Sequence, residues 1–173
     1  MIAGDAAAPT PRELAAYLDE PPQLATGSPG KNGYLRLGFE RRENRTVLAD
    51  LDRRAPLLVQ QALYWDEAMP ELPCVFMISN AGGVLQGDRN RIEIHLGRDA
   101  QAHLTTQSAT KIHEMDHNHA AQDQEIILDD GAYLEYLPEA TIPHRHSRYL
   151  TRTRISIAPT ATLLYAEILA AGR

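Results

Sequence analysis

Hydrophobic and polar residues alternate along much of the chain once the proline-rich beginning is passed. Leu35, Leu37 and Phe39 stand at every second position, and residues 46–51 repeat this pattern. Alternation with a period of two is typical of a β-strand that buries one face and exposes the other. The pattern therefore predicts a chain built mainly of strands.

An internal repeat appears when three later segments are aligned. Each consists of a short alternating strand, a polar turn and a second apolar strand. The first strands are expected at 91–96, 124–128 and 152–157, and the second strands at 100–107, 132–138 and 161–169. Ala100, Ala132 and Ala161 open the second strands and recur after roughly 30 residues, a period typical of stacked supersecondary units.

One such unit cannot bury its apolar face alone, so successive units are expected to stack. The sequence predicts an all-β fold, a β-helical or solenoid-like stack of strand hairpins with little helix. A β-sandwich-like stack satisfies the same pattern. A simple meander whose units are similar by chance remains the alternative.

The chain divides into two predicted parts. Residues 1–30 are rich in proline and alanine and lack periodicity, which predicts a flexible N-terminal arm with at most one short helix at 12–20. Residues 31–173 form the predicted β domain. Stacked folds normally close with a polar cap. No such cap follows the apolar run 163–169, so the domain is expected to be incomplete at its C-terminus.

Composition and charge exclude several classes of protein. A single cysteine, Cys74, rules out an internal disulfide and a cysteine-rich zinc module. The net charge of −6 argues against a nucleic-acid partner, which requires clustered cations. Neither a membrane-spanning apolar run nor a signal peptide is recognisable, so a cytoplasmic protein is expected.

A histidine-rich segment is the clearest candidate for metal binding. Five potential ligands, His113, Glu114, Asp116, His117 and His119, fall within seven positions. Imidazole together with carboxylate suits nickel, zinc or copper. The alternative interpretation is a solvated polar loop with only weak metal affinity.

Residues 113–117 also match the H-E-x-x-H motif of zinc-dependent hydrolases. That motif requires a helix, because only one helical turn brings both imidazoles to the same ion. The surrounding strand pattern disfavours a helix, and a zinc hydrolase is kept as the alternative function. A second histidine pair, His144 and His146, is more simply explained as part of a solvated loop.

Several motifs in a fixed order resemble the UreD/UreH family of urease accessory proteins. They comprise a glycine-rich GG-x-x-x-GD segment, an LTTQ-x-ATK segment, a GA-x-LE-x-LP segment and shorter matches. These lie at 79–89, 104–111, 131–138, 141–143, 147–148, 152–154 and 167–169. The glycine-rich segment lacks the Lys-Ser or Lys-Thr of a phosphate loop. The resemblance covers about residues 33–173, and its combination of motifs is specific.

The resemblance implies a β-helical accessory protein without catalytic activity of its own. Such a protein joins UreF and the GTPase UreG on the apo-urease subunits and assists the insertion of nickel. No cofactor would be bound permanently, and nickel would be in transit. The resemblance also implies a longer protein, because family members continue beyond the position of Arg173.

Nickel is thought to pass through an internal tunnel in this family. Asp88, Glu135, Glu139 and Glu167 lie in or beside the matching motifs and are candidates to line it. Oxygen ligands can hold Ni²⁺ weakly enough for it to move on. The histidine-rich segment departs from the family pattern, so the resemblance does not support a role for it. A plain interaction protein without metal is a third possible function.

Overall fold

The computed structural model describes residues 11–19 and 31–172 of the chain. The described residues form an all-β structure, as predicted, with one short 3-10 helix at Arg12–Tyr17. The strands are β1 (Asn32–Arg42), β2 (Arg45–Arg54), β3 (Leu57–Leu58), β4 (Cys74–Ser79), β5 (Arg89–Leu96), β6 (Gln101–Thr106), β7 (Thr110–Ile112), β8 (Ala120–Leu128), β9 (Tyr133–Tyr136), β10 (Thr141–Pro143), β11 (Tyr149–Ile157) and β12 (Thr162–Tyr165).

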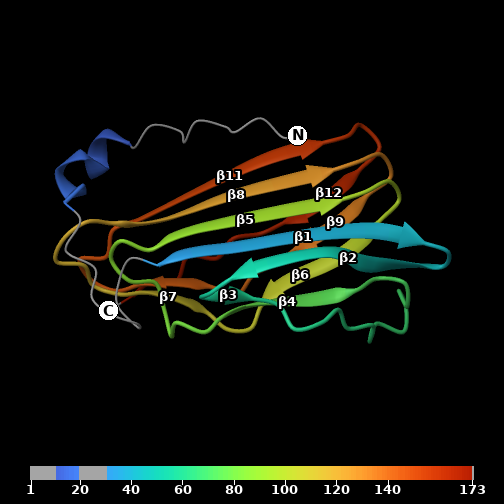
Figure 1. Cartoon of the computed structure of the whole chain (residues 1–173), viewed down its shortest axis with the longest axis horizontal. Coiled ribbons are helices and arrows are strands. Elements are labelled where there is room, and N and C mark those ends of the chain that lie inside the picture. The colour runs from blue at the N-terminus through green and yellow to red at the C-terminus, as the bar shows by residue number, and fades with distance from the viewer. Residues whose placement is uncertain (1–10, 20–30, 173) are drawn as a thin grey trace.

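Two five-stranded sheets and one two-stranded sheet contain these strands (Figure 1). The first sheet has the order β11-β8-β5-β1-β2, and the second has the order β12-β9-β6-β4-β3. The short sheet pairs β10 with β7. Neither large sheet closes on itself, and the core lies between them.

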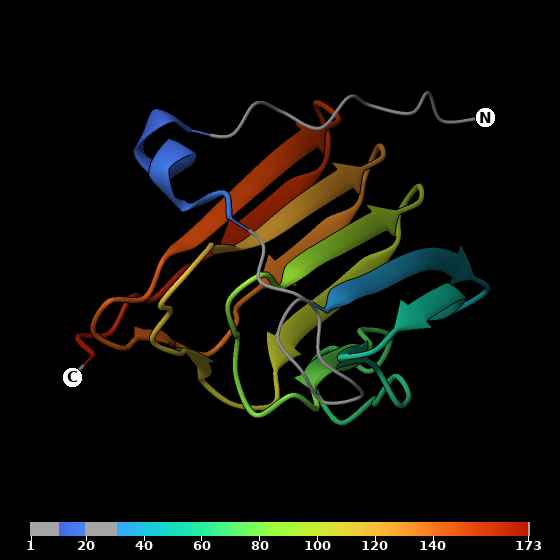
Figure 2. The same cartoon turned by 60° about the vertical axis from the view of Figure 1, so that its left-hand side comes forward.

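Successive repeat units lie side by side, as Figure 2 shows. Strands β5, β8 and β11 pair in parallel within the first sheet, and β6, β9 and β12 pair in parallel within the second. The register places Ile94 beside Ile126 and Ile126 beside Ile155. Equivalent residues of neighbouring units are therefore adjacent on the same face.

The expectation that each unit forms a hairpin is wrong. Strands β5 and β6 belong to different sheets, as do β8 and β9, and β11 and β12. The turn within each unit carries the chain from one sheet to the other instead of folding it back beside itself. Each strand obtains its backbone partners from the neighbouring unit, about 30 residues away in sequence.

The alanines that open the second strands mark an equivalent turn in all three units. In each turn the alanine N–H donates to the carbonyl three residues earlier. These bonds are Ala100 to Gly97 (3.0 Å), Ala132 to Asp129 (3.1 Å) and Ala161 to Ala158 (3.0 Å). Ala100 and Ala132 are almost fully buried, so the small side chain sits where the chain turns into the core.

The core confirms the alternation noted in the sequence. Leu35, Leu37 and Phe39 on β1 are at most 1% exposed, and they belong to the same cluster as Leu104 and Leu134 from the second sheet. Burial of a large aliphatic or aromatic side chain contributes about 1.5–3 kcal/mol relative to exposure. These inward rows provide the main stabilisation of the fold.

The inward rows continue to the last unit, where apolar residues are partly exposed. Ile155 and Ile157 on β11 are 41% and 49% exposed, and Leu163 and Tyr165 on β12 are only partly buried against the core. Among the described residues, no strand pairs with the outer sides of β11 and β12.

Most of the predicted N-terminal arm, residues 1–10 and 20–30, lies outside the described residues, so the prediction of its flexibility stays untested.

Candidate functional site: a polar cavity between the sheets

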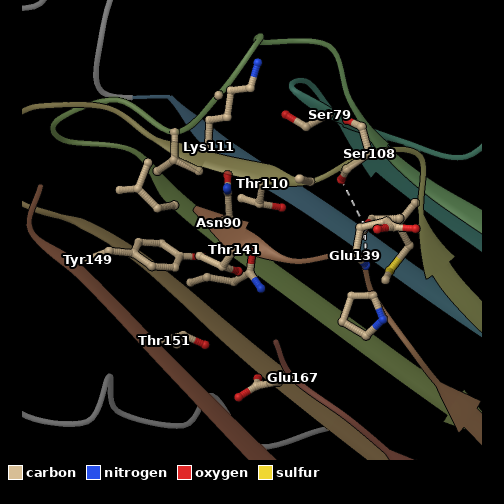
Figure 3. A pocket seen from close by; sticks show the side chains of 18 of the residues that line it. Ser79, Asn90, Ser108, Thr110, Lys111, Glu139, Thr141, Tyr149, Thr151 and Glu167 are labelled. Atoms are coloured by element: carbon tan, nitrogen blue, oxygen red, sulfur yellow. Dashed lines mark hydrogen bonds between the residues drawn. The ribbon is translucent and has the colours of Figure 1, made fainter. Parts of the chain in front are cut away.

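A cavity of about 680 Å³ opens between the two large sheets, at the side where β7 and β10 connect them. Its walls come from the end of β4, the glycine-rich loop after it, the starts of β5, β8 and β11, and the segments after β9 and β12. Figure 3 shows the lining side chains. Its polar and charged lining residues include Asn90, Lys111, Gln122, Glu139, Thr141, Tyr149, Thr151 and Glu167.

The polar wall on the first sheet is a consequence of register. Asn90 on β5, Gln122 on β8 and Thr151 on β11 are neighbours in the parallel ladder. Four residues further along the same strands, this row is replaced by Ile94 and its neighbours, which are apolar. The interior therefore changes from polar to apolar along the strands.

Two tyrosines mark the boundary between the cavity and the apolar core. Tyr136 donates a 2.7 Å hydrogen bond from its hydroxyl to Gln124 Oε1, and the Tyr165 hydroxyl lies 3.3 Å from Thr153 Oγ1. The two rings stack with their centres 5.1 Å apart. Both contacts join the second sheet to the first, so the cavity is closed on this side by cross-sheet bonds.

The charged groups of the lining are two carboxylates and one ammonium group. Glu139 and Glu167 are exposed residues that follow β9 and β12, and Lys111 lies on β7. The Tyr165 hydroxyl donates to Glu167 Oε1 at 2.5 Å, and the Glu139 backbone N–H donates to Thr106 Oγ1 at 3.0 Å. Glu139 and Glu167 belong to successive repeat units, so they line the same cavity from neighbouring layers of the stack.

Burial and the negative charge of Glu167 keep the neighbouring tyrosines protonated. Burial is the larger cause that raises the pKa of Tyr149, and Glu167 raises it further. The pKa of Tyr165 rises to about 12, first through burial and then through its hydrogen bond to Glu167. The tyrosine hydroxyls therefore act as neutral donors or weak oxygen ligands, and the carboxylates carry the negative charge.

The cavity includes two of the four acids that were candidates to line a tunnel, Glu139 and Glu167, but neither Asp88 nor Glu135. Asp88 is 2% exposed and accepts hydrogen bonds from the backbone N–H groups of Lys31 and Leu85, each at 2.9 Å. This carboxylate holds the glycine-rich loop against the start of β1. Its role in the structure is to satisfy backbone donors.

Glu135 lies on the other face of its strand. Leu134 and Tyr136 point into the core, so Glu135 points away from it. Its carboxylate is bonded to His103 Nδ1 at 2.7 Å and to the Tyr133 hydroxyl at 2.6 Å. These bonds, that from Tyr133 first, lower the pKa of Glu135 below its ordinary value of 4.5.

The histidine-rich segment forms a loop between β7 and β8 and contains no helix. The predicted alternative of a zinc-dependent hydrolase is therefore wrong, because His113 and His117 do not share a helical turn. His117 is exposed, whereas His119 is 4% exposed and its Nδ1 lies 3.3 Å from the Tyr17 carbonyl oxygen.

Glu114 and Asp116, the two acids of the segment, are exposed. Glu114 pairs with Arg145 at 3.8 Å. Among the described residues, no three His, Cys, Asp or Glu side chains form a group able to hold a metal ion. The contiguous set of five ligands does not converge in the structure.

Sequence reasoning missed the neutral part of the cavity lining. Asn90, Gln122 and Thr151 drew no attention because no motif contains all three. The internal repeat could have indicated these lining residues, since the three residues occupy equivalent places at the starts of the first strands. A polar residue recurring at an inward position of stacked strands indicates an interior that is not filled by apolar packing.

Comparison with known proteins identifies the family. A family model described as UreD urease accessory protein matches residues 31–173. The chain belongs to this family. It is 67% identical over 162 residues to "Urease accessory protein UreD 2" of Brucella ovis, covering 94% of this chain and 54% of that protein. It is 59% identical over 161 residues to "Urease accessory protein UreD" of Photorhabdus laumondii, covering 93% of this chain and 50% of that protein.

A third UreD protein, from Yersinia pseudotuberculosis, is 56% identical over 161 residues, with 93% of this chain and 50% of that protein covered. The chain thus spans about half the length of the curated UreD relatives it matches. These relatives are named as urease accessory proteins. In its described part, no helix has the length and apolar character needed to cross a membrane.

Proposed function

We propose that this chain assists urease maturation by holding UreF and UreG on the apo-urease subunits while nickel passes through its cavity to the urease active site. The observation that carries the proposal is an acid-bearing cavity inside a member of the UreD family. Glu139 and Glu167 supply carboxylates at two successive levels of that cavity. Nickel is the cargo in this proposal, and the chain binds no permanent cofactor.

The lining suits a cation that must be held briefly and released. Carboxylate, amide and hydroxyl oxygens bind Ni²⁺ less tightly than a closed set of imidazoles or thiolates would. Asn90 lines the cavity, and its Oδ1 is a buried oxygen without a hydrogen-bond partner among the described residues. Lys111 reduces the net negative charge of the lining, which also favours release.

The proposed scaffold is the solenoid-like stack of repeat units. Parallel pairing in both large sheets supports it, and so does a third ladder in which β7 pairs with β10 and Thr141 pairs with Leu169. Such a stack is rigid along its length and offers long outer faces to several partners at once. We place this assembly of UreD, UreF, UreG and urease in the cytoplasm.

Coexpression tests the scaffold. The full chain would be produced with UreF, UreG and apo-urease, captured through a tag on UreF, and the urease assayed for nickel-dependent activity. Recovery of this chain with UreF, together with activated urease, is the expected result. Failure of a folded chain to bind UreF would contradict the proposal. Assembly without any gain in urease activity would leave the plain interaction protein as the better account.

A further inference from the structure

Two histidines that are distant in sequence meet beside the cavity. His113 follows β7 directly and His144 follows β10 directly, and their rings are 5.2 Å apart between centres at an angle of 69°. We infer that His113 and His144 form a binding site for a borderline divalent cation such as Ni²⁺ or Zn²⁺, with further positions on the ion filled by water. The inference does not depend on the proposed function, because it concerns the binding of a free ion by the chain alone.

The separation of the two rings fits joint ligation. With a metal–nitrogen bond of about 2.1 Å, about 1.1 Å from ring nitrogen to ring centre and a tetrahedral angle of about 109°, two imidazoles on one ion have their centres about 5.2 Å apart. The observed distance equals this value. The spacing of the two ring centres is therefore compatible with one shared ion.

The backbone fixes both histidines in neighbouring units. Pro143 pairs with Ile112 in the parallel ladder, and the His144 N–H donates to the Ile112 carbonyl at 2.9 Å. The His113 N–H donates to the Val84 carbonyl, also at 2.9 Å. Because the two backbones are held in register, binding an ion costs less conformational entropy than it would in a mobile loop.

Gly83 provides the space for one of the rings. A side-chain carbon at this position would overlap Nε2 of His113. The absence of a side chain thus lets His113 lie against the glycine-rich loop. Gly83, Ile112 and Pro143 also line the cavity, so the histidine pair stands at its rim.

Of the charged side chains near the two histidines, Arg145 and Glu114 offset each other, and Lys111 on β7 adds one positive charge at the rim of the cavity. Arg145 follows His144, and Glu114 follows His113, and these two side chains pair with each other at 3.8 Å. The pair is largely exposed, so the two charges offset each other and are screened by solvent. Both histidines are half-buried, which leaves each ring partly open to solvent.

Calorimetric titration of the untagged full chain with nickel chloride tests the site. The wild-type chain is expected to bind one Ni²⁺ ion, and His113→Ala and His144→Ala are expected to weaken binding at least tenfold. Gly83→Ala should weaken it as well, with both imidazoles still present, because His113 is displaced. His117→Ala is the matched control, an exposed histidine of the same loop, and should bind within about twofold of wild type.

A second measurement uses only the wild-type chain and does not require the variants to fold. Addition of Zn²⁺ should shift the imidazole proton resonances of His113 and His144 in the NMR spectrum and leave those of His117 in place. The inference is overturned if the wild-type chain binds no Ni²⁺, if the two alanine variants retain its affinity, or if His117→Ala loses affinity as they do. Zn²⁺ shifts confined to His117 would overturn it too.

Discussion

Glu135 illustrates how far single residues could be assigned from the sequence. The resemblance to UreD proteins singled it out as a lining residue, yet it faces away from the core and binds His103 and Tyr133. Alternation alone would have placed it there, since Leu134 and Tyr136 on either side are large and apolar. A motif shows that a residue belongs to the family pattern, whereas the strand period shows which way its side chain points.

Replacing Glu135 by glutamine should destabilise the fold in a pH-dependent way. Hydrogen bonds from Tyr133 and His103 lower the pKa of Glu135 in the folded state, so the ionised form is stabilised by folding. This contribution is present above the unfolded pKa and is lost as the pH falls through the lower folded pKa. Chemical denaturation should show Glu135→Gln about 1–2 kcal/mol less stable at pH 7.

That difference should be smaller at acidic pH than at pH 7, because the wild-type carboxyl also becomes protonated as the pH falls through its lowered folded pKa. Glu43→Gln, at an exposed acid in the turn between β1 and β2, is the control and should change stability little at any pH. A Glu135→Gln variant whose loss of stability is equal at both pH values would contradict the assignment of the charge.

At the scale of the elements, strand positions followed from local pattern but strand partners did not. The residues of 91–96 are alternately buried within β5, as the sequence predicted. The turn after them has the same composition whether the chain folds back as a hairpin or crosses to a second sheet. The choice between a hairpin and a crossing to the second sheet depends on the pairing of β5 with β8, which forms between residues far apart in sequence. Local pattern contains no information on that choice.

The turn from β8 to β9 gives a test of the stacking. Gly131 has a φ of +71°, and its N–H donates to Thr160 Oγ1 of the next unit at 2.9 Å. An alanine at this position would have to adopt a left-handed conformation and would overlap the Asp99 carboxylate of the preceding unit. We expect Gly131→Ala to lower stability by about 1–2 kcal/mol.

Thermal unfolding followed by circular dichroism would measure this change. Gly82→Ala is an informative comparison, because Gly82 also has a positive φ of 73° but a side chain there would meet nothing within 4 Å. If both variants lose the same stability, the conformation alone explains the cost and the contact with Asp99 contributes nothing. A Gly131→Ala variant as stable as wild type would contradict the turn geometry.

At the scale of the whole molecule, the two faces of the first sheet differ in composition and in their contribution to stability. Its inner face supplies the apolar core and, at one end, the polar wall of the cavity. Its outer face carries ion pairs such as Arg36 with Asp50 and Arg152 with Asp123, both at 2.8 Å and partly or largely exposed. Exposed pairs contribute about 0–1 kcal/mol each, so this face is not what holds the fold together.

The cavity is a property of the assembled stack and of no single segment. Glu139 and Glu167 are brought together by the parallel pairing of β9 and β12, and the facing wall comes from strands of the other sheet. The family motifs indicated two of its acids. They could not indicate Asn90, Gln122 or Thr151, whose common position depends on register between units.

The most direct test of the central claim separates assembly from nickel transfer. The double variant Glu139→Gln with Glu167→Gln would be coexpressed with UreF, UreG and apo-urease, with Glu43→Gln as control, and the nickel content of purified urease measured. If nickel passes the cavity acids, the double variant should copurify normally with UreF but leave urease with several-fold less nickel than the control does. Urease with equal nickel content in both cases would contradict the account.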